Sequence, residues 1–483
     1  MKKVTLLAAS VLAGLMSAQA SAAVTPDVAL KGDASYFRAG VYSRHFYGNG
    51  GKVGRLGNEN DNYIELAPSV TLAEVDGTEW RFTTSFAMQS QDNGAWQATD
   101  KDGNTGEDIA FANTQAFLRV TGLLDSDKDA TLWVGKKYQR VDSHIVDIYW
   151  RNTSGSGVGF ENLSLGSGKL RASWTRRADV RDFELIHSGY STEDGVDDDG
   201  NAKSVNKPSR TATNMFDVEY GFAPFDSSWA SVGYTFVAPQ RYASEYSNYG
   251  YKLAKKDTNG HVFTAVLGES LLGGWNTTVA RFVKGGTADE GFNSHTYTGS
   301  SHSMFDPIQY KDSSSYNIDL IDYGAVNITE NLNMLYHVWF NFSKIKECQD
   351  GKETYGRDFQ LVLRPQYKLT KMTRLILETG MYTSSTNTNV FGDEGESHNT
   401  QQQKVTLAYA ITPDAGNAWS RPEIRFFATY RHFGHKDGRT GVYGGGYTVN
   451  TMNTGNVTTS LVDSLYEGRK SNIFFGAQAE AWF

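Results

Sequence analysis

Apolar and polar residues alternate along much of the chain with a period of two. Over residues 63–72, Ile64 and Leu66 fall on one face of an extended segment, whereas Tyr63 and Glu65 fall on the other. Such alternation places one face of a strand against an apolar medium and the other against water. The same pattern recurs in three later segments, at residues 359–369, 423–431 and 473–483. The chain is therefore expected to consist mainly of strands.

Two kinds of sheet protein fit this alternation. A β-sandwich hides its apolar face in a protein core, whereas an outer-membrane barrel turns that face towards lipid around a polar lumen. Arginine and glutamate recur on the polar face, and long polar stretches such as residues 90–108 and 187–210 resemble the external loops of a barrel. Roughly 460 residues, at about 25 for each strand with its connection, give about 18 strands. We therefore expect an all-β fold, a transmembrane β-barrel of about 18 strands, as one domain over residues 23–483.

The N-terminal segment, residues 1–22, has a different character. Lys2 and Lys3 precede an apolar run, residues 4–16, that is too short to span a bilayer, and small residues follow it. This order is typical of a signal peptide that is removed before Ala23. We therefore expect an exported protein.

Charge and cysteine content exclude some other classes. The formal net charge is −8, which gives no reason to expect a nucleic-acid partner. Cys348 is the only cysteine in the sequence, so an intrachain disulfide is impossible.

The last residues of the chain pose a more specific question. Alternation places Phe483 with Phe475 on the apolar face, where Phe483 is expected to meet lipid in the interfacial aromatic girdle. Trp482 falls on the polar face beside Glu480. A tryptophan in a polar lumen either packs on neighbouring side chains or an infolded loop, or offers a ring on which the C–H face of a sugar can stack. Alternation alone leaves both interpretations open.

Four longer segments resemble a known protein family, and this resemblance distinguishes the two interpretations. They are GRLGNENDNYIEL at residues 54–66, LWVGKKYQRVDSHIVDIYWRNTSGSGVGFENL at 132–163, AWSRPEIRFFATY at 418–430 and GAQAEAWF at 476–483. In this order they resemble the maltoporin (sugar porin) family of bacterial outer membranes. The resemblance covers the whole mature chain and is weakest in two loops, near residues 185–210 and 435–465. It implies a homotrimer of eighteen-stranded antiparallel transmembrane β-barrels in outer-membrane lipid, each pore narrowed by an infolded constriction loop.

The resemblance also implies a path of aromatic residues that guides linear sugars through the pore. In the family, one of these residues lies on a loop that reaches into the pore of the neighbouring subunit, and Trp96 matches it. The six matching positions of this chain are Tyr36, Tyr63, Trp96, Trp275, Trp419 and Trp482.

Polar residues beside this path match the family as well. Arg38 follows Tyr36 by two residues and therefore shares its strand face. The segment at residues 139–149 resembles the constriction loop, with Tyr149 at the narrowest point. Without the resemblance, the same charges would indicate only a solvated lumen. The matching positions are Arg38, Arg55, Glu65, Arg140, Asp142, His144, Asp147 and Tyr149.

Two departures from the family pattern bear on the choice of sugar. Ala110 stands where an arginine can occur, and Asn152 stands at a carboxylate position. Fewer charged contacts leave the preferred sugar open. We expect passage of maltose and maltodextrin-type oligosaccharides, with sucrose or β-glucosides as alternatives, and a general diffusion porin as the rival without a sugar site.

No signature of covalent chemistry appears in the sequence. No local motif joins a nucleophile, a base and an orienting group, and the histidines lack paired metal-ligand spacing. The acidic run at residues 196–200 lacks the spacing of an EF-hand and reads as a solvated loop. We expect a channel for facilitated diffusion that is not an enzyme and needs no cofactor or metal, with external loops that are candidate receptors for bacteriophage.

Overall fold

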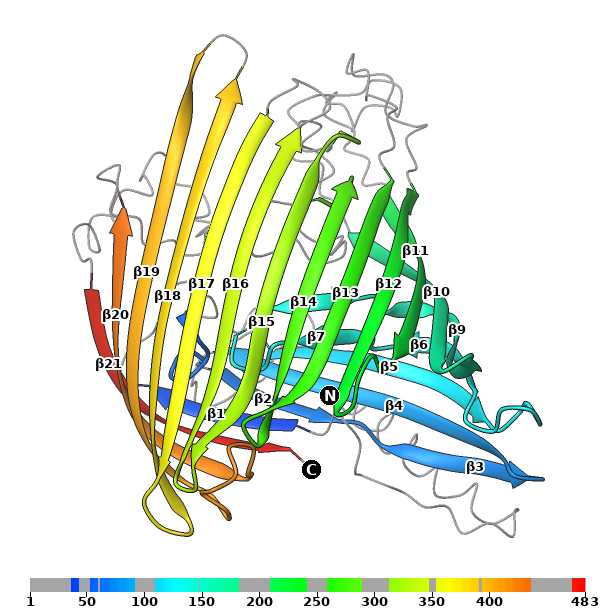
Figure 1. Cartoon of the computed structure of the whole chain (residues 1–483), viewed down its shortest axis with the longest axis horizontal. Coiled ribbons are helices and arrows are strands. Elements are labelled where there is room, and N and C mark those ends of the chain that lie inside the picture. The colour runs from blue at the N-terminus through cyan, green and yellow to red at the C-terminus, as the bar shows by residue number, and fades with distance from the viewer. Residues whose placement is uncertain are drawn as a thin grey trace, which may run out of the picture.

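The computed structural model describes eleven ranges of the chain, which consist mainly of β-strands (Figure 1). The ranges are residues 36–42, 53–59, 61–91, 109–146, 148–181, 209–240, 259–288, 312–346, 353–390, 393–435 and 471–482. The strands are β1 (Tyr36–Tyr42), β2 (Asp61–Leu66), β3 (Ser69–Val75), β4 (Thr78–Gln91), β5 (Ile109–Thr121), β6 (Thr131–Lys137), β7 (Arg140–Asp142), β8 (Tyr149–Asn152), β9 (Gly155–Leu165), β10 (Gly168–Arg181), β11 (Ser209–Phe222), β12 (Ser228–Gln240), β13 (Gly260–Leu271), β14 (Gly274–Gly285), β15 (Tyr316–Thr329), β16 (Leu332–Lys346), β17 (Glu353–Lys368), β18 (Thr373–Val390), β19 (Asp393–Ile411), β20 (Glu423–His435) and β21 (Ser471–Trp482). Within these ranges no helix has the length and apolar character needed to cross a membrane.

The strands close into an antiparallel barrel. The last strand, β21, pairs with the first, from Tyr36 opposite Trp482 to Tyr42 opposite Gly476, and Figure 1 shows these red and blue strands side by side. Both β2 and β3 pair with β4, so they are two halves of one wall strand that is interrupted at residues 67–68. Of the 21 described strands, β7 and β8 form a separate hairpin, and β2 and β3 count once, which leaves 18 in the wall. The predicted strand number and topology are therefore confirmed.

The distribution of side chains is the inverse of that in a water-soluble sheet protein. On β20, Ile424 and Phe426 are exposed, whereas Glu423, Arg425 and Arg431 are buried. A continuous exposed face of large apolar side chains, with charges turned inward, matches a barrel that faces lipid. The faces predicted for residues 423–431 are confirmed, while Phe483 and the signal peptide at residues 1–22 lie outside the described residues.

Connections between wall strands differ in length at the two ends of the barrel. Two residues make the turn at residues 76–77, 166–167, 272–273 and 330–331. The first wall strand begins, and the last wall strand ends, at this short-turn end, because Tyr36 and Trp482 are paired there. The constriction segment and most of the other long connections leave the wall at the opposite end, whereas the connection at residues 412–422 lies at the short-turn end.

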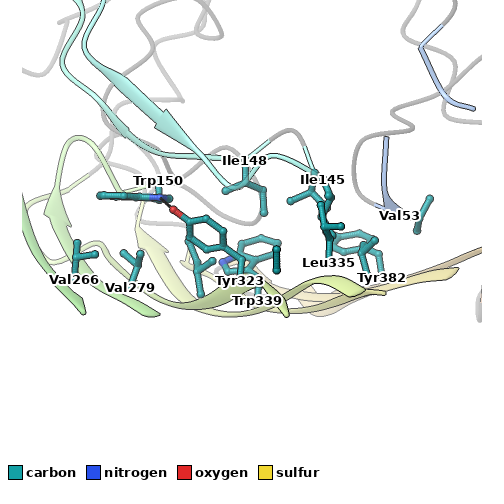
Figure 2. Close-up of a cluster of buried hydrophobic side chains, with 14 residues drawn as sticks. Val53, Ile145, Ile148, Trp150, Val266, Val279, Tyr323, Leu335, Trp339 and Tyr382 are labelled. Carbon is teal, nitrogen blue, oxygen red and sulfur yellow. Dashed lines mark hydrogen bonds between the residues drawn. The ribbon is translucent and has the colours of Figure 1, made fainter. Parts of the chain in front are cut away.

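The first infolded segment is the predicted constriction loop, residues 138–154, with β7 and β8 as its hairpin. Figure 2 shows Ile148 and Trp150 above side chains of the barrel wall, where they belong to one buried apolar cluster with Tyr323 and Trp339. The indole Nε1–H of Trp150 donates a hydrogen bond to the Tyr323 hydroxyl at 3.0 Å. Apolar burial therefore holds this loop against the inner face of the wall.

An ionic contact fixes the same loop at its base. Arg151 of β8 is buried and pairs with Asp217 and Glu219, both on β11. Thr235 on β12 also donates to Asp217 at 2.7 Å. The loop is thus tied by charge to one part of the wall and by apolar packing to another.

The second infolded segment is residues 53–59, which contain the RLGNE motif. Leu56 is buried in an apolar cluster with Phe427 and Phe474, two aromatic side chains on the inner face of the wall. This crossing of the lumen was not predicted, because the segment lacks alternation and its contacts are made with strands more than 300 residues away. Its docking also accounts for apolar side chains on an otherwise polar inner face.

A buried ionic cluster anchors this second segment. The Lys404 ammonium donates to the Gly54 and Leu56 carbonyl oxygens at 2.8 and 2.7 Å and pairs with Glu378 at 2.6 Å. Glu378 also pairs with Arg364 at 2.5 Å and accepts from the Leu56 backbone N–H at 3.0 Å. Gly54 has a φ of +97°, and a Cβ there would lie 2.4 Å from the Glu378 carboxylate. Only glycine fits this approach without strain.

Removal of the carboxylate charge should destabilise the barrel. The Glu378→Gln variant keeps the shape of the side chain but leaves Lys404 and Arg364 buried without their anion, and breaking a buried pair costs about 3–5 kcal/mol. We expect a clear fall in the urea midpoint for unfolding in detergent, with Glu330→Gln, in the exposed turn between β15 and β16, as the control. An unchanged midpoint would show that the cluster is not a structural anchor.

Candidate functional site

Three of the predicted aromatic residues lie together where the barrel closes. Trp482 on β21 is opposite Tyr36 on β1, and Tyr63 on β2 is opposite Arg38, two residues further along β1. The ring centroids of Tyr36 and Trp482 are 6.4 Å apart with planes 16° apart, and those of Tyr36 and Tyr63 are 5.7 Å apart. Three adjacent strands therefore form one aromatic stripe on the inner face.

A cationic pair borders this stripe. The Arg38 guanidinium lies 5.8 and 5.9 Å from the ring centroids of Tyr36 and Tyr63, within the range of cation–π attraction. Arg38 pairs with Glu59 at 2.8 Å, and Arg55 pairs with the same carboxylate at 2.6 Å. Burial alone would raise the pKa of Glu59, but Arg55 and Arg38 outweigh it and hold the pKa below its usual value. Glu59 is therefore a fixed anion between two guanidinium groups.

The ring of Trp482 also lies next to a pair of charged side chains. The Arg421 guanidinium lies 4.0 Å from the Trp482 ring centroid and pairs with Glu480 at 2.7 Å. The Tyr36 hydroxyl donates to the same carboxylate at 2.7 Å. The Arg421 side chain is only 6% accessible, whereas Trp482 keeps 38% of its surface exposed. The arginine thus fixes the indole ring while part of the ring remains open.

Two further predicted aromatic residues, Trp275 and Trp419, form a second aromatic group. Their ring centroids are 6.2 Å apart and their ring planes are 26° apart. His144 of the constriction loop meets them edge-on at 5.9 and 5.1 Å, and Tyr323 lies 5.7 Å from Trp275. Trp419 precedes Arg421 by two residues, so the turn between β19 and β20 connects this group with the stripe at Trp482.

His144 is held in an unusual environment. Its backbone has a φ of +65°, a left-handed conformation uncommon outside glycine. Its side chain keeps 48% of its surface accessible, but the surrounding rings displace solvent. This desolvation lowers the pKa of His144, Arg55 lowers it further, and Asp142, 3.2 Å from Nδ1, opposes both only in part. The imidazole is therefore neutral at pH 7.

The remaining constriction residues form a small stack. The Arg140 guanidinium lies 4.0 Å from the ring centroid of Tyr138 and 4.5 Å from that of Tyr149. The Arg55 guanidinium donates to the His144 carbonyl oxygen at 3.1 Å, which joins the second infolded segment to the constriction loop. Arg55 of the second infolded segment is thus hydrogen-bonded to the loop that carries Arg140 and Tyr149.

Glu65 is placed differently from the other charged candidates. It is buried, and its carboxylate accepts hydrogen bonds from Tyr63 at 2.5 Å, Ser85 at 2.9 Å and Thr114 at 3.2 Å. With these partners, Glu65 positions the Tyr63 ring. Trp96 and Asp147 lie outside the described residues, as does the side chain of Ala110.

Several residues of the site were not found by sequence reasoning. Tyr323 and Arg421 could have been: Tyr323 follows the alternation of β15, and Arg421 lies within the AWSRP motif. Glu59 could not, because its segment reaches the site only by folding inward. Within the described ranges, no group of three or more His, Cys, Asp or Glu residues could hold a metal ion. What the site offers chemically is ring faces next to fixed charges.

Comparisons with known proteins agree with this architecture. A family model described as LamB porin matches residues 34–483. Maltoporin 1 of Klebsiella pneumoniae subsp. pneumoniae is 31% identical over 435 residues, which cover 88% of this chain and 90% of that protein. Maltoporin 2 of Yersinia pestis is 29% identical over 384 residues, which cover 78% and 81%.

Among solved structures, the outer membrane channel DcaP of Acinetobacter baumannii is 13% identical, with 78% of this chain and 96% of that chain covered and a TM-score of 0.42, a likeness too slight to support an assignment. The family match and the maltoporin relatives do support one, since they span most of the chain. The chain therefore belongs to the LamB porin family, and its barrel lies in a bacterial outer membrane.

Proposed function

We propose that this porin is a sugar-selective channel for the facilitated diffusion of maltose and maltodextrin-type oligosaccharides. The observation that carries the proposal is the inner aromatic stripe of Trp482, Tyr36 and Tyr63, bordered by the Arg38–Glu59 and Arg421–Glu480 pairs. The names of the maltoporin relatives agree with this substrate class.

Each part of the stripe suits one part of a sugar. The C–H face of a pyranose ring is apolar, so contact with an aromatic face removes apolar surface from water. Hydroxyl groups make strong hydrogen bonds with ionised side chains. Because Arg38 and Arg421 are already paired with carboxylates, a sugar exchanges hydrogen bonds within existing pairs and meets no bare charge. Binding of this kind is weak and spread over several subsites, which lets the sugar leave as well as enter.

Two alternative functions remain. Sucrose or β-glucosides would use the same chemistry, and Ala110 and Asn152 are the positions that bear on this choice. A general diffusion porin has no use for a row of inward-facing rings, so the aromatic stripe favours a sugar channel over it.

The partners of this channel are also part of the proposal. We infer a homotrimer in outer-membrane lipid, in which Trp96 reaches the pore of the neighbouring subunit. The apolar outward face of the wall supports contact with lipid. The external loops are candidate receptors for bacteriophage. The channel itself would carry out no covalent reaction.

Removal of the Trp482 ring should weaken sugar binding and leave ion conduction unchanged. The Trp482→Ala variant loses a ring contact of roughly 0.5–1.5 kcal/mol, so the half-blocking sugar concentration should rise about 2- to 12-fold. The measurement is single-channel current in a planar bilayer during titration with maltotriose, sucrose and cellobiose. Trp174→Ala is the matched control, because Trp174 is exposed and faces outward from β10. Unchanged block in Trp482→Ala, or no block of the wild-type channel by any of the three sugars, would argue for a general porin.

The proposed role of Trp96 predicts an effect between subunits. In mixed trimers that hold one Trp96→Ala subunit and two wild-type subunits, the weakened pore should be the one adjacent to the variant. A second substitution that closes the variant's own pore makes the two cases distinguishable in single-channel records. Wild-type sugar block in both remaining open pores would contradict the proposed reach.

The lowered pKa of His144 predicts how sugar block depends on pH. The neutral imidazole persists from pH 8 to below the ordinary value of about 6.5, so sugar block should be constant in this range and weaken at lower pH. Protonation then places a cation among the rings and beside Arg55. Stability should fall in the same direction, because the unfolded chain takes up this proton at higher pH than the folded chain. His144→Phe should give a flat profile, and an equally steep profile in that variant would assign the titration to another group.

A further inference from the structure

The outward face of β13 to β17 carries a band of basic and aromatic residues near the long-connection end of the barrel. Backbone pairing aligns one row of five residues across these strands: His261, Lys284, Tyr316, Lys344 and Tyr355. Each lies within two residues of the end of its strand on that side. We call these five residues the basic collar.

A second row lies two residues further into the wall and continues the same register. It consists of Phe263, Phe282, Ile318, Phe342 and Arg357. The four apolar members are all exposed large side chains. The basic collar therefore borders the apolar band of the outward face, where lipid headgroups meet acyl chains.

Charge around the basic collar is predominantly positive. Two carboxylates lie near the described residues of these rows. That of Glu353 pairs with Lys344 at 3.0 Å, and that of Asp312, whose backbone is hydrogen-bonded to Lys346, accepts from the Ser314 backbone N–H at 2.8 Å. Lys284 and Arg357 are exposed, and Lys346 shares the outward face with Lys344 by alternation. Besides the Lys344–Glu353 pair, Lys284, Lys346 and Arg357 stand against the single carboxylate of Asp312, and this positive excess favours an anionic ligand.

The spacing suits an anion of the size of a phosphate group. Lys284 and Lys344 flank Tyr316 on the strands to either side of β15. Neighbouring strands are about 4.8 Å apart, so the two lysine backbones are about 10 Å apart. Their flexible side chains can converge above the Tyr316 ring on one ligand.

Orientation places the basic collar at the outer leaflet. In outer-membrane barrels the long connections face the cell exterior and the short turns face the periplasm. The connection that holds Trp96 follows β4, which is remote from β13–β17 in the order of strands around the barrel. The basic collar therefore faces lipid rather than the proposed neighbouring subunit.

We propose that the basic collar binds the phosphorylated headgroup of an acylated lipid in the outer leaflet. Lys284 and Lys344 contact the phosphate, Arg357 and Lys346 add positive charge around it, and the acyl chains lie along the second row at Phe282, Ile318 and Phe342. The site lies on the opposite face of the wall from the sugar stripe and is independent of it.

One outward carboxylate on these strands does not oppose this ligand. Asp322 is six residues from Tyr316 on β15, about 20 Å along the strand. Asn276 donates to it at 3.1 Å, and Thr278 donates to it at 2.6 Å. Its charge is therefore distant from the headgroup and already hydrogen-bonded.

The test is binding of phosphorylated lipid to the full-length, delipidated protein in detergent. Three probes separate the sources of phosphate: lipid A, dephosphorylated lipid A and inorganic phosphate alone. We expect lipid A to bind, with an affinity that falls as salt rises, and the other two to bind at least tenfold more weakly. Lys284→Gln and Lys344→Gln should each weaken lipid A binding about fivefold, and the double variant about 25-fold.

Controls keep this test decisive. Lys136→Gln removes an exposed cation on β6, far from the basic collar, and should leave binding unchanged. Lys344→Arg keeps the charge and should bind as the wild type does. All variants should retain wild-type sugar block, which also confirms that they are folded. Equal affinity for dephosphorylated lipid A, equal affinity for inorganic phosphate alone, or unchanged lipid A binding in the folded double variant would overturn the proposal.

Discussion

Closure of the sheet between β1 and β21 is the constraint on which the rest of the structure depends. A barrel in lipid must leave no open sheet edge, because unpaired backbone groups are costly where water is absent. The pairing that removes this edge also places Tyr36 opposite Trp482 and Arg38 opposite Glu480. The aromatic stripe and its charged border are therefore products of the same contacts that complete the wall.

Charge pairing explains how so polar an interior is compatible with a stable fold. Buried cations meet carboxylates on the wall, as Lys404 does with Glu378 on the neighbouring strand and as Arg151 of the constriction loop does with Asp217. Uncompensated charges in such positions would be strongly destabilising. The same pairing holds both infolded segments in place, so the shape of the lumen and the neutralisation of its charges have a common origin.

Much of the wall was predictable from sequence because strand alternation is a local property. The faces of residues 423–431 follow from a period of two, and a typical strand length gives about 18 wall strands. The exact number and the antiparallel order came from the family resemblance. The proximity of Trp482 to Tyr36 is not local, and only the family resemblance suggested it. The crossing of residues 53–59 to β18 and β19 was missed entirely, since no short-range pattern encodes a contact with Glu378 or Lys404. Glu59 was missed for the same reason.

The position of the aromatic stripe at the seam has a consequence for the order of assembly. Its rings come from the two ends of the folded chain, and Trp482 follows Tyr36 by 446 positions in sequence. A nascent or partly inserted sheet can contain Tyr36 and Tyr63, but the Trp482 ring joins them only when the last strand pairs with the first. The stripe is thus completed in the same event that seals the wall, and a barrel that has not sealed has no complete stripe.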